Sequence, residues 1–166
     1  MEFLGLLKIR VRRGINLAVR DTHSSDPYVV ITMGNQKVKS PVVKDSCNPV
    51  WEVDMSLAIH DPNAPITLTL YDKDTFTVDD KMGDAEIDIK PYLEAMKMGL
   101  KGLPDGSKVH SVEPSEENCL AVGSNIVWEH GKMTQEMILR LRNVECGEVE
   151  IQIEVIDAPS PKANLF

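Results

Sequence analysis

Apolar and polar residues alternate with a period of two along much of this chain. Leu7, Ile9 and Val11 alternate with three basic residues, which predicts a strand that buries one face and exposes the other. Alternation or β-branched composition predicts further strands at 28–33, 37–39, 53–57, 66–70, 85–89, 137–142 and 149–155. Gly34-Asn35 has the composition of a tight hairpin turn. Strands of this number, with one helix, predict an all-β fold, an eight-stranded antiparallel β-sandwich.

The second half of the chain is less regular. Residues 91–98 start with a proline and are followed by Gly99, which predicts a short helix. Met96 and Met98 in this helix either fill the core or form an adaptable contact surface. Residues 99–123 show little periodicity, so we expect a loop with one weak strand near Val109. Residues 158–166 contain prolines and are expected to form a loose tail.

The composition limits the function. A chain of 166 residues is long enough for one domain with a single core. The net charge of −8 at pH 7 argues against nucleic acid as a partner, because general binding to the phosphate backbone relies on clustered Lys and Arg. Three cysteines without a Cys-x-x-Cys spacing indicate reduced thiols in a cytosolic protein. We find no apolar stretch long enough for a signal peptide or a membrane span, which agrees with this expectation.

The densest group of charges lies between residues 70 and 84, where an expected strand leads into a loop with five aspartates. Clustered carboxylates repel one another, so such a loop is stable only when it is well hydrated or binds a cation. Ca²⁺, which takes about six to eight oxygen ligands, suits this chemistry. A second acidic loop, with Asp21 and Asp26, follows the first strand. Loops at the same end of a β-sandwich can meet and pool their carboxylates.

Two other interpretations of this segment fit less well. Asp72 and Asp74, followed by Thr75, are similar to the motif of haloacid-dehalogenase-type phosphotransferases, with Asp72 as nucleophile and Asp74 as acid/base. Those enzymes are doubly wound α/β proteins, whereas this chain offers almost no crossover helices. An EF-hand counted from Asp72 would need glycine where Thr77 stands and glutamate where Gly83 stands. We therefore do not expect an enzyme.

A family resemblance rests on several segments in one order. They are residues 5–11, Asn16-Leu17, 25–29, 48–51 and 71–74, with Gly83 closing the acidic loop. Together these segments strongly resemble a C2 domain. The resemblance implies that Ca²⁺ is bound by the carboxylates of Asp21, Asp26, Asp72, Asp74 and Asp80, and by main-chain carbonyls of Arg20 and Lys73. Asp79 and Asp84 match no ligand position and are expected to lie behind the ligands or to be solvated.

The strand order resembles the permuted C2 topology of phospholipase-C type, because the chain begins with the strand that feeds the first acidic loop. Segments 88–91, 118–120, 139–141 and 144–150 are similar to the plant single-domain C2 proteins related to abscisic acid signalling. That resemblance implies one C2 domain over residues 1–157, with a family-specific insert at about 90–136. The implied function is a calcium-dependent phospholipid-binding adaptor that recruits abscisic acid receptors of the PYR/PYL type to the plasma membrane.

The implied partners are anionic phospholipid membranes and these receptors. The implied location is the cytoplasm and the surface of the plasma membrane, with the nucleus as a further compartment. An alternative function stays open: a regulator that stimulates GTP or ATP hydrolysis by an Obg-like nucleotidase, so that the protein acts on an enzyme without being one.

Four residues are candidates for lipid contact. Phe76 and Val78 lie on the acidic loop and can insert into a membrane once the charge is neutralised; a packed loop anchor is the competing interpretation. Lys37 and Lys39 are alternate residues of one strand and share a face that can meet a phosphoinositide. A solvated edge strand explains the two lysines nearly as well.

Overall fold

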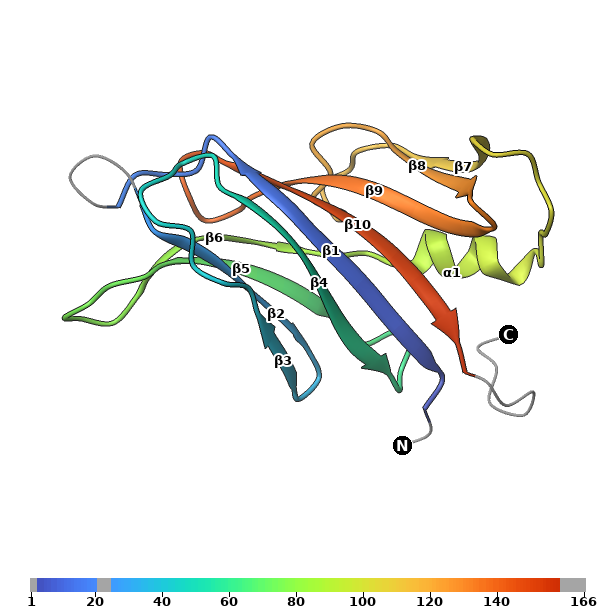
Figure 1. Cartoon of the computed structure of the whole chain (residues 1–166), viewed down its shortest axis with the longest axis horizontal. Helices are drawn as coiled ribbons and strands as arrows, with labels where there is room; N and C mark the ends of the chain where they lie inside the picture. Colours follow the sequence, from blue (N-terminus) through green and yellow to red (C-terminus); the bar gives the residue numbers. More distant parts are fainter. Residues whose placement is uncertain (1–2, 21–24, 159–166) are drawn as a thin grey trace.

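Two antiparallel β-sheets and one short helix make up the fold (Figure 1). The structure is a computed structural model and describes residues 3–20 and 25–158. Its elements are β1 (Gly5–Ile15), β2 (Pro27–Met33), β3 (Gln36–Lys39), β4 (Val50–Ile59), β5 (Ile66–Asp72), β6 (Asp80–Glu86), α1 (Lys90–Lys97), β7 (Ser107–Val112), β8 (Ser124–Glu129), β9 (Lys132–Arg140) and β10 (Glu148–Asp157). The predicted all-β sandwich is confirmed.

The strand order brings the acidic loops to one end. One sheet has six strands in the order β4-β1-β10-β9-β8-β7, and the other has four in the order β3-β2-β5-β6. The first and last strands pair with each other, as the permuted topology requires. The loop between β5 and β6 projects from the left end of the molecule in Figure 1, the end at which β1 also finishes.

The predicted alternation identifies the core correctly. Leu7, Ile9 and Val11 on β1 have no exposed surface, and neither do Ile151 and Ile153 on the neighbouring strand β10. They belong to one cluster that joins the inner faces of both sheets. Removing a large aliphatic side chain from water contributes about 1.5–3 kcal/mol. These inner faces therefore hold the sandwich together and support the loops at its ends.

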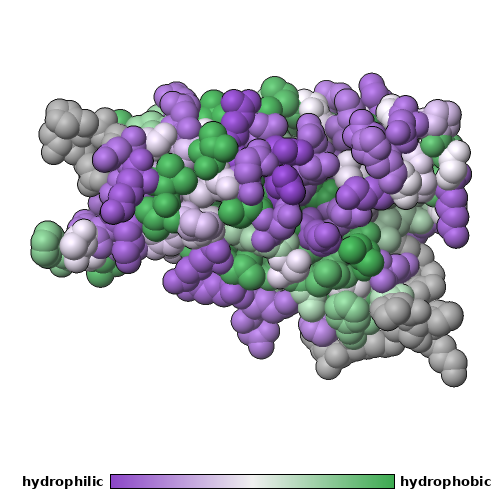
Figure 2. All heavy atoms as spheres, viewed as in Figure 1, coloured by the Kyte–Doolittle hydropathy of each residue, from purple (hydrophilic) through white to green (hydrophobic). Residues whose placement is uncertain are grey.

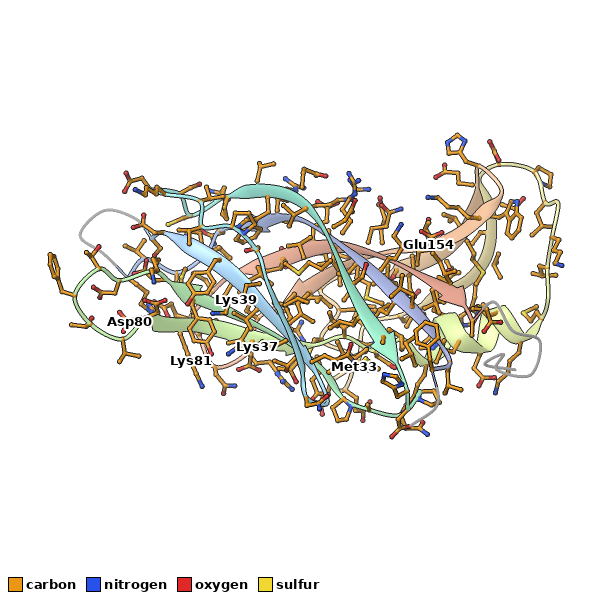
Figure 3. The ribbon with its side chains drawn as sticks, turned by 60° about the horizontal axis from the view of Figure 1, so that its bottom comes forward. Met33, Lys37, Lys39, Asp80, Lys81 and Glu154 are labelled. Atoms are coloured by element: carbon orange, nitrogen blue, oxygen red, sulfur yellow. The ribbon has the colours of Figure 1, made fainter. Side chains whose placement is uncertain are left out.

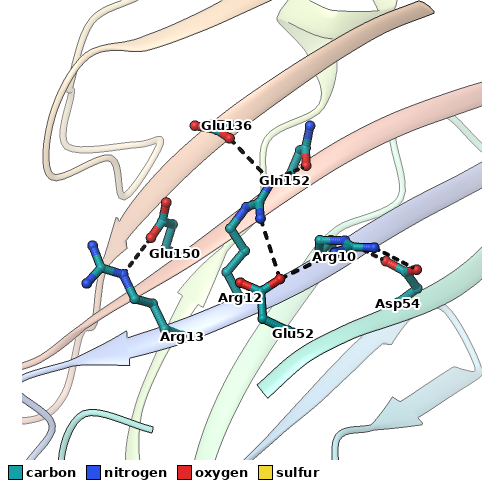
Figure 4. Close-up of polar contacts among 8 residues, drawn as sticks. All are labelled: Arg10, Arg12, Arg13, Glu52, Asp54, Glu136, Glu150 and Gln152. Atoms are coloured by element: carbon teal, nitrogen blue, oxygen red, sulfur yellow. Dashed lines mark hydrogen bonds and ion pairs between the residues drawn. The ribbon is translucent and has the colours of Figure 1, made fainter. Parts of the chain in front are cut away.

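An ion-pair network covers part of the outer face of the six-stranded sheet (Figure 4). The register of β1 shifts between Val11 and Arg13 against both neighbouring strands, and this bulge turns Arg12 and Arg13 toward carboxylates on the same face. The contacts are Arg10–Asp54 at 3.0 Å, Arg10–Glu52 at 3.3 Å, Arg12–Glu52 at 3.5 Å, Arg12–Glu136 at 3.4 Å and Arg13–Glu150 at 2.7 Å. On this face, cations of β1 neutralise carboxylates of its neighbours.

Residues 90–136, the predicted insert, are more regular than their sequence suggests. The weak strand predicted near Val109 is β7, and β8 was not predicted. With these two, the described residues form ten strands where we expected a sandwich of eight. β8 forms a hairpin with β9, in which Glu129 pairs with Lys132 across His130 and Gly131. Both turn residues have positive φ, the conformation that a two-residue hairpin turn requires. A His-Gly pair is a weaker turn signal than Asn-Gly, which explains the omission.

The predicted helix is present as α1, one residue earlier than expected. Tyr92 is buried, and its hydroxyl donates a hydrogen bond to the Met133 carbonyl, which fixes the helix to β9. Met96 packs partly against the core, whereas Met98 at the end of the helix is 61% exposed. Of the two methionines, Met98 is thus the one available for contact with a partner.

Ala158 is still attached to the sandwich, because its N–H donates a hydrogen bond to the Leu4 carbonyl. The rest of the predicted tail, residues 159–166, lies outside the described residues. Among the described helices, none is long and apolar enough to cross a membrane.

Candidate metal and membrane site

Three of the predicted ligand residues meet where β2, β5 and β6 begin or end. Asp26 precedes β2, Asp72 ends β5 and Asp80 begins β6. The Asp26 N–H donates to Asp72 Oδ1 at 2.8 Å, and the Lys73 N–H donates to the Asp26 carbonyl at 3.0 Å. Asp72 and Asp80 face each other as partners in the β5–β6 ladder. The end of the first acidic loop and the start of the second are therefore joined directly.

Asp72 is the most deeply placed of these carboxylates, with 2% of its surface exposed. An ionised carboxylate that has lost its hydration needs hydrogen bonds or a cation to compensate. The backbone N–H of Asp26 supplies one such bond. Asp26 is itself oriented by the Asp45 N–H, which donates to its Oδ1 at 2.8 Å. The carboxylates are thus positioned by backbone groups of other loops.

The loop between β5 and β6 is organised by its own carboxylates. Asp74 Oδ1 accepts a hydrogen bond from the Phe76 N–H at 3.1 Å. Asp79 Oδ1 accepts one from the Asp74 N–H at 2.8 Å, and its other oxygen accepts one from the Tyr28 hydroxyl. Hydrogen bonds with Thr77 and with the Phe76 N–H lower the pKa of Asp74. The bond from Tyr28, followed by that from the Asp74 N–H, lowers the pKa of Asp79.

Asp79 was expected to lie behind the ligands or to be solvated. Its side chain is 17% exposed and closes the loop onto Asp74 and Tyr28, so it is more enclosed than a freely solvated carboxylate. Lys73 lies 3.8 Å from Asp79 and is mostly exposed. The role of Asp79 in closing the loop was missed because sequence spacing cannot tell which of two adjacent aspartates turns inward.

The backbone before the first acidic loop is also fixed. The Arg20 N–H donates to Ser25 Oγ at 2.9 Å, and this hydroxyl donates to the Ala18 carbonyl at 2.9 Å. The guanidinium of Arg20 forms two hydrogen bonds of 2.9 Å with the two carboxylate oxygens of Glu145. The predicted ligand Asp21 lies outside the described residues.

The donor set suits Ca²⁺, because the predicted ligands in the described residues offer carboxylate and carbonyl oxygens only. Across residues 3–20 and 25–158, no three His, Cys, Asp or Glu side chains converge closely enough to hold a metal ion. Several of these carboxylate oxygens instead accept backbone N–H groups. The chemistry of the donors therefore fits Ca²⁺, but the described side chains do not by themselves converge into a complete set of ligands.

The tip of the β5–β6 loop is apolar and projects into solvent. Phe76 is 92% exposed and Val78 is 88% exposed, so the competing interpretation of a packed anchor is wrong. Figure 2 shows hydrophobic side chains at the left end of the molecule, where this loop projects in Figure 1. Two large apolar side chains with so little protein contact, beside carboxylates, are unusual on a surface that meets only water.

Lys37 and Lys39 are exposed on β3, the edge strand of the four-stranded sheet (Figure 3). Tyr28 and Tyr71 stack on each other at the loop end of this sheet, with ring centroids 5.5 Å apart. Lys81 is the ladder partner of Tyr71 on β6. The predicted shared face of Lys37 and Lys39 therefore forms part of a sheet surface with a cation on each edge and aromatic rings between them.

Comparison with known proteins agrees with these features. The family model described as C2 domain matches residues 5–103. The Arabidopsis thaliana protein named C2-DOMAIN ABA-RELATED 4 is 55% identical over 161 residues, covering 97% of this chain and 91% of that protein. The protein named C2-DOMAIN ABA-RELATED 10, from the same plant, is 60% identical over 153 residues and covers 91% and 85%. A relative from Oryza sativa subsp. indica, named GTPase activating protein 1, is 51% identical over 161 residues and covers 97% of each chain.

Solved structures with the same fold are more distant in sequence. A calcium-bound structure of two C2 domains of Extended-Synaptotagmin 2 superposes with a TM-score of 0.64 at 20% identity, covering 95% of this chain and 48% of that one. A single C2 domain of plant Extended Synaptotagmin 1 gives a TM-score of 0.62 at 14% identity, covering 96% of this chain and all of that one. At such identity the likeness establishes the fold alone.

Proposed function

The chain belongs to the C2 domain family and groups with the plant C2-domain ABA-related proteins, and from this premise we propose that it is a calcium-dependent membrane-docking adaptor. The observation that carries the proposal is the direct bond between the two acidic loops, from the Asp26 N–H to Asp72, beside the exposed tip with Phe76 and Val78. One end of the sandwich thus combines hard oxygen donors with an exposed apolar loop tip.

In the proposed mechanism, electrostatics controls docking. Without metal, the carboxylates of the loop end form a negative rim that an anionic leaflet repels. The expected ligands are the carboxylates of Asp21, Asp26, Asp72, Asp74 and Asp80, together with the carbonyls of Arg20 and Lys73. When held by these residues, Ca²⁺ would supply the positive charge that offsets the rim and attracts lipid phosphates. Phe76 and Val78 then insert shallowly, and Lys37 and Lys39 add a weaker attraction of about 1 kcal/mol or less each.

Co-sedimentation with vesicles tests this proposal. We expect the protein to pellet with phosphatidylserine vesicles in Ca²⁺, to remain in solution in excess chelator, and to bind less well as salt is added. Vesicles of neutral phosphatidylcholine are the matched control and should bind little. Salt-insensitive binding in chelator would contradict the proposal, because the acidic loops would then not control docking.

We further propose that residues 91–131 carry the specificity for a protein partner, an abscisic acid receptor of the PYR/PYL type. The names of the Arabidopsis relatives and the surface of the insert support this role. A hollow of about 620 Å³ lies between α1 and β7, lined in part by Pro91, Ala95, Met98 and Val109. Grafting the insert onto an unrelated C2 domain should transfer receptor binding, and a deletion variant that still binds the receptor would contradict the assignment.

The name of the rice relative favours a second candidate function, the regulation of nucleotide hydrolysis by a partner enzyme. On that proposal, the purified protein accelerates GTP or ATP turnover by an Obg-like nucleotidase and has no turnover of its own. Receptor recruitment without any such acceleration would favour the adaptor.

A further inference from the structure

Arg20 is a cation of the chain's own at the edge of the acidic end. It is the last described residue before the first acidic loop, and its side chain is 25% exposed. The hydrogen bond with Glu145, and more weakly the charge of Asp80, raises the pKa of Arg20. The Arg20 N–H donates to Ser25, which precedes the predicted ligand Asp26, so Arg20 lies at the edge of the predicted calcium site.

Glu145, in the loop between β9 and β10, holds this cation. Nη1 and Nη2 of Arg20 each donate to a different carboxylate oxygen of Glu145 at 2.9 Å, and Nη1 also donates to the Val19 carbonyl at 3.2 Å. The Glu145 bond raises the pKa of Arg20, and the reciprocal bond lowers the pKa of Glu145 to about 2. A two-point bond of this kind fixes the direction in which a guanidinium points.

The loop that carries Glu145 is itself rigidly attached to the rest of the site. Asp84 on β6 and Arg142 exchange backbone hydrogen bonds of 2.7 and 3.1 Å, and the Arg142 side chain donates to Asp84 Oδ1 at 2.8 Å. A methyl group at Gly83 would lie 2.6 Å from Val144, so the two segments touch. Glu145 is thereby presented to Arg20 from a fixed position that depends on β6.

From this geometry we propose that Glu145 is a positioning residue that keeps the Arg20 guanidinium away from the aspartates, and so prevents Arg20 from competing with Ca²⁺. The inference rests on the proposed calcium function. A guanidinium carries five N–H donors in a plane that suits carboxylates. Released from Glu145, it pairs with Asp80 and occupies a ligand that calcium needs.

A double-mutant cycle measured by calorimetric titration with CaCl₂ tests the proposal. We expect Glu145→Gln to weaken calcium affinity about fivefold, the effect of one exposed ion pair. Adding Arg20→Gln to Glu145→Gln removes the competitor and should restore affinity to within about twofold of wild type. Glu94→Gln, the same change on α1 and far from the loops, is the control and should have no effect.

The calcium affinity of the double variant shows whether Glu145 prevents Arg20 from competing with Ca²⁺ or only stabilises the loops. If Glu145 only braces the loops, the double variant binds calcium as weakly as Glu145→Gln or more weakly, and the proposal fails. Unchanged affinity in Glu145→Gln overturns it as well. Melting curves in chelator show whether each variant is folded.

A second double-mutant cycle measures the free energy of unfolding in chelator and so does not depend on bound calcium. Once Glu145 is replaced, Arg20 should pair with Asp80, so Asp80→Asn should destabilise Glu145→Gln more than it destabilises wild type. If wild type takes up no Ca²⁺ yet this coupling appears, the proposed function fails while the restraint of Arg20 stands. If the coupling is absent, Glu145 does not restrain Arg20 and the inference is wrong.

Discussion

The outer face of the six-stranded sheet and the loop end of the sandwich both contain many charged side chains, but these side chains have different partners. On the sheet, Arg10, Arg12 and Arg13 lie among carboxylates of neighbouring strands and form ion pairs with them. At the loop end, aspartates from two loops meet with backbone N–H groups as their main partners. Of the cations there, Lys73 lies 3.8 Å from Asp79, and Arg20 is held by Glu145.

The difference indicates where each region obtains its positive charge. The sheet supplies its own cations, so its electrostatic stability is complete when the chain has folded. At the loop end, Lys73 and Arg142 pair with Asp79 and Asp84, whereas the predicted ligands Asp26 and Asp74 accept backbone N–H groups. A high local density of charge therefore points to a binding site only where the fold leaves that charge uncompensated.

The largest expected effect comes from removing the loop carboxylates. A ligand that binds only the native state at a hundredfold excess over its Kd stabilises it by about 2.7 kcal/mol. Asp72→Asn combined with Asp74→Asn should abolish this gain, measured as the shift in Tm between chelator and Ca²⁺. The matched control, Glu52→Gln with Asp54→Asn, removes two carboxylates from the sheet and should keep the shift. Equal Tm values for wild type with and without millimolar Ca²⁺ would remove the basis for the comparison.

The apolar tip should have the next largest effect. Partial burial of a Phe side chain in lipid contributes roughly 1–1.5 kcal/mol, about tenfold in affinity. Phe76→Ala should therefore weaken binding to phosphatidylserine vesicles in Ca²⁺ by about that factor, without changing calcium affinity. Val122→Ala, at a half-exposed valine on the insert, is the control. Unchanged vesicle binding of Phe76→Ala would show that the tip does not enter the membrane.

A substitution in the sheet network tests the other half of the comparison. Arg12 donates to Gln152 at 2.6 Å and pairs with Glu52 and Glu136, and its side chain is 25% exposed. Arg12→Met keeps the apolar stem but removes the donors, which should lower the free energy of unfolding by about 1 kcal/mol. Urea unfolding in chelator measures this loss. Calcium stabilisation should stay the same, and a smaller calcium shift in Arg12→Met would mean that the two regions are coupled.

The sequence predicts these two regions unequally. Alternation placed Leu7, Ile9 and Val11 in the core because a strand exposes one face every second residue. The predicted ligands Asp26, Asp72 and Asp80 lie next to strand ends, as the expected strand boundaries imply. The partners Arg20 and Glu145 are 125 positions apart, and Arg12 and Glu136 are 124 apart. Such pairs depend on strand order and on the bulge in β1, which no local pattern encodes.

The smallest expected effect belongs to Lys37 and Lys39, the exposed cations of the edge strand β3. Each lysine near an anionic leaflet contributes at most about 1 kcal/mol, and salt screens part of it. Lys37→Gln with Lys39→Gln should therefore weaken calcium-dependent vesicle binding by about fivefold or less, since these lysines lie away from the loop tip. Lys101→Gln with Lys108→Gln makes the same change of net charge on exposed residues of the insert and should have less effect still. The β3 variant could instead lose all vesicle binding in Ca²⁺ while its calcium affinity is unchanged. The chain's own cations would then attract the membrane, and bound Ca²⁺ at the loop end would not be the main source of positive charge.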